Sequence, residues 1–324
     1  MRRLVLILTV AGAVVAPAPP ASAHGGDVPD ATAYRTTVTQ ITPPMRGVSV
    51  RTVEAGARLE LTNDSGRTVE VLGYAGEPYL EVRPDGTYEN VHSPATYLNV
   101  TLSGDGPVPS AADPTAVPSW RRVSGSTTVR WHDRRTHWLE PAPSLTRAQR
   151  LRDWAVPLRD QTRTFEIRGT LDYVPPPATG RWWAGAVLLA VAVAALAMRW
   201  RRAVRAVALI AGTITLGNAV LRALDGMPLS PVLIVVGLVA VAAGALAYRP
   251  FLIALAGVVL AVFAGLVNAG VFGAAVVPAA GPAWLSRLAV LVAIGAGAGM
   301  VIAAVSRLRT APDAVHIARR SGGA

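Results

Sequence analysis

The sequence predicts an all-β exported sandwich followed by an all-α membrane domain of five transmembrane helices. Three observations carry this fold class. Residues 24–178 consist of short β-branched or alternating segments separated by turn signals, without a helical period. Beyond residue 180 the chain is a succession of apolar runs of about 20 residues, the length that crosses a bilayer as a helix. An N-terminal export signal predicts that the β part lies outside the membrane.

Residues 1–23 have the pattern of a secretory signal peptide. Two arginines precede the apolar run Leu4–Val15, and the small residues that follow end in the sequence ASA at 21–23. A charged start, an apolar stretch and an A-x-A end are the features of a cleaved export signal. Cleavage after these residues is expected to leave His24 as the first residue of the mature chain, with a free α-amino group beside its imidazole.

Eight to ten short strands in about 150 residues predict an antiparallel sandwich of immunoglobulin or cupredoxin type over residues 24–174. The segments 58–63 and 67–74 are expected to pair as a hairpin around an NDSG turn. Residues 103–119 are a predicted polar loop, and the proline-rich residues 175–181 are a predicted stiff spacer. The chain has no cysteine, so its core alone must stabilise the domain. The predicted strands are YRTTVTQI, GVSVRTV, RLELTN, RTVEVLGY, YLEVRPDG, ATYLNVTL, TTVRWH, THWLE, DWAVPL and TFEIRGTLDYV.

Residues 182–308 are predicted to form the membrane domain, and residues 309–324 a cytoplasmic tail. An exported N-terminus followed by five crossings puts the C-terminus inside. The arginines agree with this direction, because they concentrate in the loops and tail on the predicted inner side, whereas the outer loops hold only Arg222 and Arg287. The sequence thus predicts a multi-pass protein of the cell membrane with an extracytoplasmic N-terminal domain. The predicted spans are Trp182–Met198, Ala206–Leu221, Leu229–Ala247, Phe251–Val271 and Leu288–Val305.

The net charge of +11 does not indicate nucleic-acid binding. Residues 24–178 hold 17 arginines against 18 acidic residues, whereas residues 179–324 hold 12 arginines against two aspartates. The excess therefore belongs to the membrane half. Every basic residue is arginine and none is lysine, which indicates a compositional bias, and we expect no nucleic-acid partner.

The predicted spans lack the groups of an ion pathway. None contains Asp, Glu or His, and the only amides at depth are Asn218 and Asn268, which are expected to hydrogen-bond between helices. Gly295, Gly297 and Gly299 form a small-residue face, which predicts either a seam within the chain or a contact between copies. No Ser-His-Asp set, phosphate loop, CxxC or HExxH motif is present, so the sequence favours no enzyme class.

Two histidines are close in the nearly palindromic segment VRWHDRRTHW. A four-residue hairpin loop at 133–136 would make His132 and His137 cross-strand partners on one face, with Trp131 and Trp138 on the other. Two opposed imidazoles can share one metal ion, and a nitrogen-rich planar set favours copper(II). Alternatively, the two histidines only stack or hydrogen-bond to backbone carbonyls.

A processed N-terminal histidine on an exported β-sandwich, with a second histidine elsewhere, resembles the copper proteins that use a histidine brace. These include CopC-type copper-resistance proteins, lytic polysaccharide monooxygenases and the cupredoxin-like subunit of particulate methane monooxygenase. The resemblance implies that the amine and ring of His24 chelate copper and that His132 or His137 completes a T-shaped set. The Asp-x-His spacing of CopC-type proteins and a methionine cluster are absent. The layout HGGD…RWHD…HW is also similar to that of uncharacterised actinobacterial membrane proteins.

The expected function is copper handling, delivery or sensing outside the membrane, with a copper-trafficking or other envelope protein as the expected partner. One alternative is a metal-free structural or interaction module of the cell envelope. A third is a copper-dependent oxidase, for which the sequence offers neither a substrate groove nor a redox partner.

Overall fold

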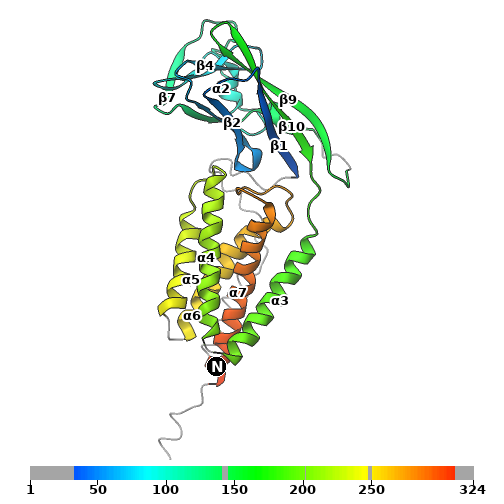
Figure 1. The fold of residues 1–324 in the computed structure, drawn as a ribbon, viewed down its shortest axis with the longest axis vertical. Coiled ribbons are helices and arrows are strands. Elements are labelled where there is room, and N and C mark those ends of the chain that lie inside the picture. The colour runs from blue at the N-terminus through cyan, green and yellow to red at the C-terminus, as the bar shows by residue number, and fades with distance from the viewer. Residues whose placement is uncertain (1–32, 141–144, 201, 247–249, 311–324) are drawn as a thin grey trace, which may run out of the picture.

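The computed structural model describes residues 33–140, 145–200, 202–246 and 250–310. A β domain lies at one end of a bundle of helices (Figure 1). The predicted signal peptide, His24 and nearly all of the predicted cytoplasmic tail lie outside the described residues.

The β domain consists of two antiparallel sheets, as predicted. The larger has the strand order β1-β10-β9-β4-β5-β6-β7, and the smaller has the order β2-β3-β8. The strands are β1 (Tyr34–Thr42), β2 (Val48–Val53), β3 (Arg58–Asn63), β4 (Val69–Leu72), β5 (Pro78–Arg83), β6 (Gly86–Asn90), β7 (Trp120–Ser124), β8 (Thr128–Trp131), β9 (Gln149–Asp160) and β10 (Arg163–Tyr173).

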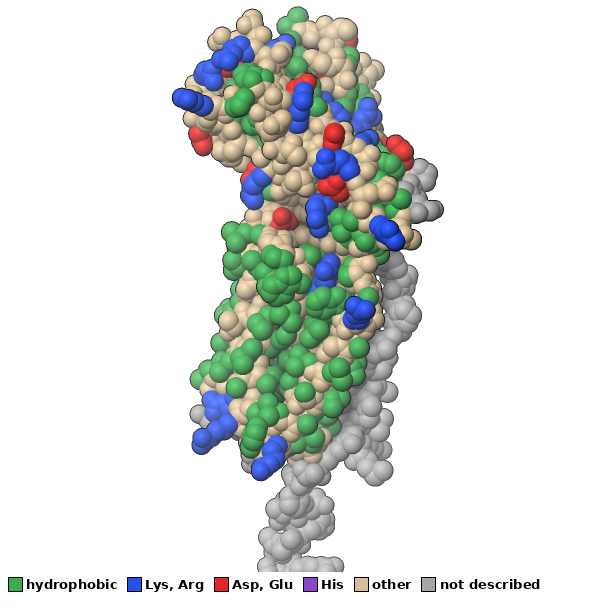
Figure 2. All heavy atoms as spheres, turned by 45° about the vertical axis from the view of Figure 1, so that its right-hand side comes forward, with side chains coloured by type: hydrophobic (Ala, Val, Ile, Leu, Met, Phe, Trp, Pro, Cys, Tyr) green, Lys and Arg blue, Asp and Glu red, His purple; other side chains and the backbone are tan. Residues whose placement is uncertain are grey.

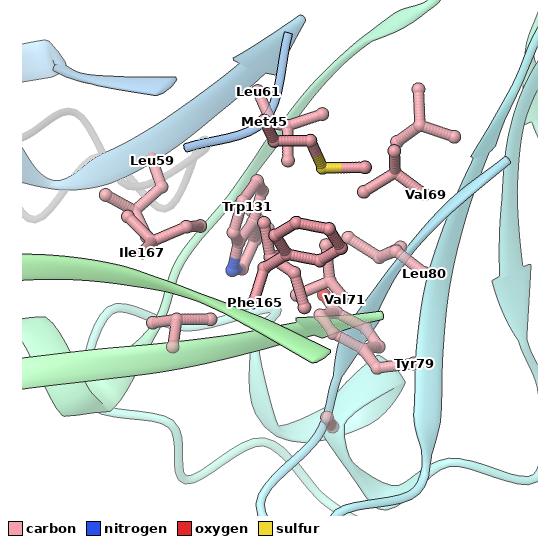
Figure 3. Packing of buried hydrophobic residues seen from close by; sticks show 14 of the residues in the cluster. Met45, Leu59, Leu61, Val69, Val71, Tyr79, Leu80, Trp131, Phe165 and Ile167 are labelled. Atoms are coloured by element: carbon pink, nitrogen blue, oxygen red, sulfur yellow. The ribbon is translucent and has the colours of Figure 1, made fainter. Parts of the chain in front are cut away.

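Side chains from both sheets form one hydrophobic core (Figure 3). Leu59 and Leu61 alternate inward from β3 and face Val71 and Ile167 of the larger sheet; all four are at most 1 % exposed. Burial of each such side chain stabilises the fold by about 1.5–3 kcal/mol. This core takes the place of disulfides in a chain without cysteine.

Three local predictions are wrong. β3 and β4 do not form a hairpin, because they belong to different sheets and face each other across the core. The segment predicted as a strand at 95–102 begins as a helix, α2 (Pro94–Leu98), because Ser93 caps the Ala95 N–H and Pro94 occupies the first turn. The predicted strand at 136–140 is irregular, and β7 was not predicted. The predicted polar loop at 103–119 is confirmed, since it contains neither helix nor strand.

Within the described residues, four helical segments are long and apolar enough to cross a membrane, not the predicted five: Thr179–Arg199, Ala203–Leu224, Pro250–Phe272 and Ala283–Arg307. The remaining predicted span forms α5 (Pro231–Leu246), whose 16 residues rise only about 24 Å, less than the ~30 Å hydrocarbon core. The chain therefore has the make-up of a multi-pass membrane protein. The helices are α3 (Thr179–Arg199), α4 (Ala203–Leu224), α5, α6 (Pro250–Val259), continued by η3 (Leu260–Gly265) and η4 (Leu266–Phe272), and α7 (Ala283–Thr310).

Arginines cap helices at the end of the bundle away from the β domain. Arg205 donates to the carbonyl oxygens of Gly244 and Ala245 at the end of α5, and Arg307 donates to that of Ala197 near the end of α3. These side chains satisfy carbonyl groups that a helix end leaves without partners. Basic side chains gather at this end in Figure 2, below an apolar exterior.

The glycines of α7 form seams within the chain. A Cβ atom at Gly295 or Gly299 would lie 2.8 or 2.7 Å from backbone oxygens of α3, whereas one at Gly297 would lie 2.5 Å from the oxygen of Gly257 in α6. Each glycine thus lets two backbones approach. Of the two alternatives that the sequence left open, the structure shows the intramolecular one.

The side-chain amides of Asn218 and Asn268 form hydrogen bonds within the helical domain. Asn218 accepts a hydrogen bond from the Ser286 hydroxyl at 2.9 Å, which joins α4 to α7. Asn268 instead donates to the carbonyl oxygens of Phe263 and Ala264, at 3.0 and 3.3 Å, where the helix widens to a π-helical turn. Only the first bridges two helices as predicted; the second satisfies carbonyls within its own helix.

Replacing Gly299 by valine is expected to lower the free energy of unfolding of the helical domain by about 1–3 kcal/mol, because the new side chain must displace α3. Gly217→Val is the matched control, since no atom lies within 4 Å of a Cβ at that position. Chemical unfolding of the detergent-solubilised chain measures both. Equal destabilisation by the two substitutions would contradict the assigned seam.

Candidate functional site

A strained loop between β2 and β3 lies at the junction of the two halves. Glu54 and Ala55 both have φ 58°, and Gly56 has φ 89°, so three consecutive residues adopt the left-handed conformation. This conformation costs roughly 1–2 kcal/mol for each residue with a Cβ atom. We call residues 54–57 the junction loop. Such strain persists only where surrounding contacts impose it.

Asp225, which follows α4, holds the junction loop from the membrane side. The Glu54 N–H donates to the Asp225 carbonyl oxygen at 2.7 Å, and the Ala55 N–H donates to its Oδ2 atom at 2.8 Å. Burial raises the pKa of the Asp225 carboxyl, although the hydrogen bond from the Ala55 N–H acts in the opposite direction. Asp225 thus anchors the left-handed turn through two neighbouring N–H groups.

Two arginines of the small sheet reinforce this contact. Arg51 donates to the Leu224 carbonyl oxygen at 3.1 Å, and Arg130 donates to that of Gly226 at 2.8 Å. The carboxylate of Glu60 lies 2.6 Å from each guanidinium and holds both in place. The β domain is therefore docked on the end of α4 through a hydrogen-bonded interface.

The opposite side of the junction loop contacts both histidines of the VRWHDRRTHW segment. The Ala57 carbonyl oxygen lies 2.9 Å from Nδ1 of His132 and 3.1 Å from Nε2 of His137. Since one oxygen accepts from both rings, these two nitrogens are at most 6.0 Å apart, the sum of the two distances. The structure thus brings His132 and His137 together, as the sequence predicted.

The predicted hairpin does not bring them together. β8 ends at Trp131 and pairs with β3 alone, and the next residues form a 3₁₀ turn, η2 (Arg134–Thr136). The Asp133 carboxylate starts this turn by accepting from the Arg135 N–H at 3.1 Å. The predicted pairing of tryptophans is also wrong, because Trp131 lies in the core whereas Trp138 stacks on Tyr34 with ring centroids 6.2 Å apart.

Asp133 is fully buried and organises the turn. The Arg135 guanidinium donates to both of its carboxylate oxygens, at 2.8 and 2.7 Å, and the Trp131 indole N–H donates to it at 3.2 Å. Arg152 adds hydrogen bonds to the carbonyl oxygens of Arg135 and His137. These contacts fix the backbone on both sides of the histidine pair.

The two histidines have different chemical roles in this arrangement. Nε2 of His132 accepts a hydrogen bond from Arg58 at 3.0 Å, so its Nδ1 carries the proton donated to Ala57. Both ring nitrogens of His132 are therefore engaged. His137 donates through Nε2, and no hydrogen bond within the described residues reaches its Nδ1 atom. Burial lowers the pKa of His137 to about 4, which keeps the ring neutral near pH 7.

His137 lines a cavity of about 460 Å³ beside the junction loop. Its lining combines aromatic and apolar side chains with hydroxyl and carboxylate groups. The lining residues are Tyr34, Thr36, Glu54–Ala57, Thr101, Leu102, Ser103, Asp105, His137, Trp138, Leu139 and Leu171. An apolar cavity with a few convergent polar groups is the usual form of a ligand site.

No family model matches the sequence, and no curated protein or solved structure is detectably similar to it. The functional assignment therefore depends on the geometry of this site.

The structure leaves the predicted metal set incomplete. His24 lies outside the described residues, and within the described parts of the chain no three His, Cys, Asp or Glu side chains gather as a metal site. His92 lies between β6 and α2, and its ring hydrogen-bonds at 2.8 Å to the carbonyl oxygen of Val117, which belongs to the long polar loop. The junction loop and the role of Asp225 were not predicted from the sequence. Gly56 is the one residue of the loop whose type favours a left-handed conformation.

Replacing Ala55 by glycine is expected to raise the free energy of unfolding by about 1 kcal/mol, because glycine adopts the left-handed conformation without a Cβ clash. Ala57→Gly is the control. Ala57 has φ −63°, so glycine there only adds flexibility to the unfolded chain and is expected to cost about 0.5–1 kcal/mol. Urea unfolding of both variants measures the difference; a loss of stability in both would mean that the loop is not strained.

Proposed function

We propose that this chain is a membrane-anchored, extracytoplasmic copper-binding protein that handles, delivers or senses copper. The proposed ligands are the terminal amine and ring of His24 and the Nδ1 atom of His137. His132 positions the junction loop and is not a ligand. The expected partner is an envelope or copper-trafficking protein that takes or supplies the ion.

The state of His137 is the observation that carries this proposal. A metal-binding histidine must be neutral, and its second ring nitrogen usually donates to a carbonyl or carboxylate group that fixes the ring. His137 meets both conditions, since its Nε2–H donates to Ala57 and its pKa is lowered to about 4. Its Nδ1 atom, which no hydrogen bond from a described residue reaches, belongs to a side chain that lines the cavity.

The position of β1 makes His24 a feasible second ligand. Tyr34 begins β1 and lines the same cavity as His137. His24 precedes Tyr34 by ten residues, and such a segment spans at most about 33–36 Å when extended. The N-terminal amine of a chain cut before His24 can therefore reach the cavity. Three nitrogen ligands of this kind suit copper(II).

The proposed orientation places the β domain outside and the arginine-capped end of the bundle in the cytoplasm, following the positive-inside rule. Although α5 is short, it contacts α4 through Gly244 near the capped end and through Gly237 further along, so it is proposed to complete a fifth crossing. Reporter fusions after Gly180, Arg202 and Gly226 should report outside, inside and outside. An outside location after Arg202 would overturn this orientation.

A paired titration tests the copper site. Two forms of the full chain are compared, one that begins at His24 and one with a single alanine before it. The added residue converts the terminal amine to an amide and leaves every side chain intact. Electron paramagnetic resonance should show a nitrogen-rich copper(II) site in the first form and a weaker, altered site in the second. Identical spectra and affinities would rule out the amine as a ligand.

The second candidate is a metal-free structural or interaction module of the cell envelope. The saturated hydrogen bonds of His132 favour it, because they show that one member of the histidine pair serves the fold. Absence of stoichiometric copper binding in both forms of the chain would make this the better assignment.

A further inference from the structure

A second cavity, of about 470 Å³, lies on the membrane side of the junction loop. It is lined by residues from both domains: 35–37 of β1, Thr52 of β2, Ala55 and Gly56 of the junction loop, Asp225, residues 275–277 and 279–282 of the connection from η4 to α7, and Ala283 at the start of α7. The cavity thus lies between the β domain and the helical domain. Figure 1 shows that these two parts adjoin at this end of the bundle. Ala55 and Gly56, whose backbone has positive φ, thus line this cavity. Backbone strain of this kind is often found at ligand-binding segments.

Two groups of opposite charge in this cavity have unused binding capacity. Arg35 is exposed, and within the described residues it makes no ion pair or hydrogen bond. Thr37 lies two residues further along β1 and therefore on the same face, where it also lines the cavity. Asp225 uses its Oδ2 atom to accept from Ala55, whereas no hydrogen bond from a described residue reaches its Oδ1 atom. A ligand with both an anionic and a cationic group matches this pair.

The cavity lies at the level where lipid head groups are expected. Ala283 lines it, and the next residue, Trp284, begins the apolar surface of α7 and is 52 % exposed. Trp183 is exposed near the start of α3, at the same end of the bundle. Indole rings concentrate at the boundary between hydrocarbon and head groups. Figure 2 shows the same change from an apolar exterior to charged side chains at this level.

We propose that this cavity binds the head group of a phospholipid that carries a phosphate and a primary ammonium group, as in phosphatidylethanolamine. The Arg35 guanidinium binds the phosphate, and the Asp225 carboxylate accepts a hydrogen bond from the ammonium group. A trimethylammonium group has no N–H to donate, and a glycerol head group has no cation. The site therefore distinguishes phosphatidylethanolamine from phosphatidylcholine and phosphatidylglycerol.

Native mass spectrometry of the full chain in detergent, titrated with short-chain forms of these three lipids, tests the proposal. One phosphatidylethanolamine is expected to bind per chain, more tightly than the other two lipids. Arg35→Gln and Asp225→Asn should each weaken its binding on the order of tenfold, the effect of losing one charge-assisted hydrogen bond. Asparagine keeps an oxygen that can accept from the Ala55 N–H. Arg46→Gln is the matched control, because Arg46 is exposed and does not line the cavity.

Several results would overturn the proposal. No bound lipid, or no effect of Arg35→Gln beyond that of Arg46→Gln, would exclude the phosphate contact. Equal binding of phosphatidylglycerol, with no effect of Asp225→Asn, would show a simple anion site. Free phosphoethanolamine that competes as strongly as the lipid would identify a soluble ligand instead of a membrane lipid. None of these outcomes depends on copper.

Discussion

Replacing Asp133 by alanine is expected to lower the free energy of unfolding of the β domain by about 3–5 kcal/mol. The Asp133 side chain is fully buried and pairs with the Arg135 guanidinium through two hydrogen bonds, at 2.8 and 2.7 Å. Alanine would leave the mostly buried arginine without its counter-ion and the Trp131 indole N–H without its acceptor. Urea unfolding of the full chain, followed by near-ultraviolet circular dichroism, measures the change.

Asp153→Ala provides the matched control for this substitution. Asp153 also pairs with an arginine, Arg150 at 3.4 Å, but its side chain is 75 % exposed. Its loss is expected to change stability by no more than about 0.5 kcal/mol. Similar effects of the two substitutions would show that the buried pair does not hold the turn that carries the histidines.

The stability of the β domain is expected to fall by about 3 kcal/mol as the pH decreases from about 6.5 to about 4. Burial lowers the pKa of His137 from 6.5 to about 4, and each unit of difference corresponds to about 1.4 kcal/mol. Between these values the unfolded chain binds a proton that the folded chain does not bind. The contribution is therefore fully present above pH 6.5 and is lost as the pH falls through this range.

His137→Gln isolates this effect, because glutamine can still donate to Ala57 but does not titrate. Urea midpoints at pH 7, 5.5 and 4.5 should fall more steeply for the natural chain than for the variant. Parallel curves would mean that His137 titrates normally in the fold. An α-amino group ordinarily titrates near pH ~8, so protons are expected to compete with copper more at a terminal amine than at His137, whose pKa is about 4.

The larger features of the fold were predictable because they follow from periodicity. Alternation at Leu59 and Leu61 identified an inward face, and the length of the apolar runs identified membrane helices. The errors have local causes. Ser93 and Pro94 begin a helix in a segment whose β-branched and aromatic residues favour a strand. Which sheet a strand joins depends on partner strands that are far away in the sequence. For this reason the prediction of a β3–β4 hairpin was wrong.

The candidate site was predictable only in part. The spacing of His132 and His137 correctly indicated that they lie together. Their shared hydrogen-bond acceptor could not be predicted, because the carbonyl oxygen of Ala57 belongs to a residue 75 and 80 positions earlier in the chain. The left-handed turn could not be predicted, since Glu54 and Ala55 have no preference for that conformation. The turn exists because Asp225, 170 positions after Ala55, accepts hydrogen bonds from the N–H groups of Glu54 and Ala55.

The most direct test of the central claim is electron paramagnetic resonance of copper(II) bound to the chain that begins at His24, with the four forms natural, His137→Gln, His132→Gln and His92→Gln. Loss of a residue that only hydrogen-bonds to a metal ligand weakens metal binding about 10–100-fold, so loss of His137 as a direct ligand should weaken copper binding by more than roughly 100-fold. The copper spectra of His132→Gln and His92→Gln should keep the same number of nitrogen ligands as the natural chain. An unchanged spectrum and affinity in His137→Gln would contradict the proposed copper site.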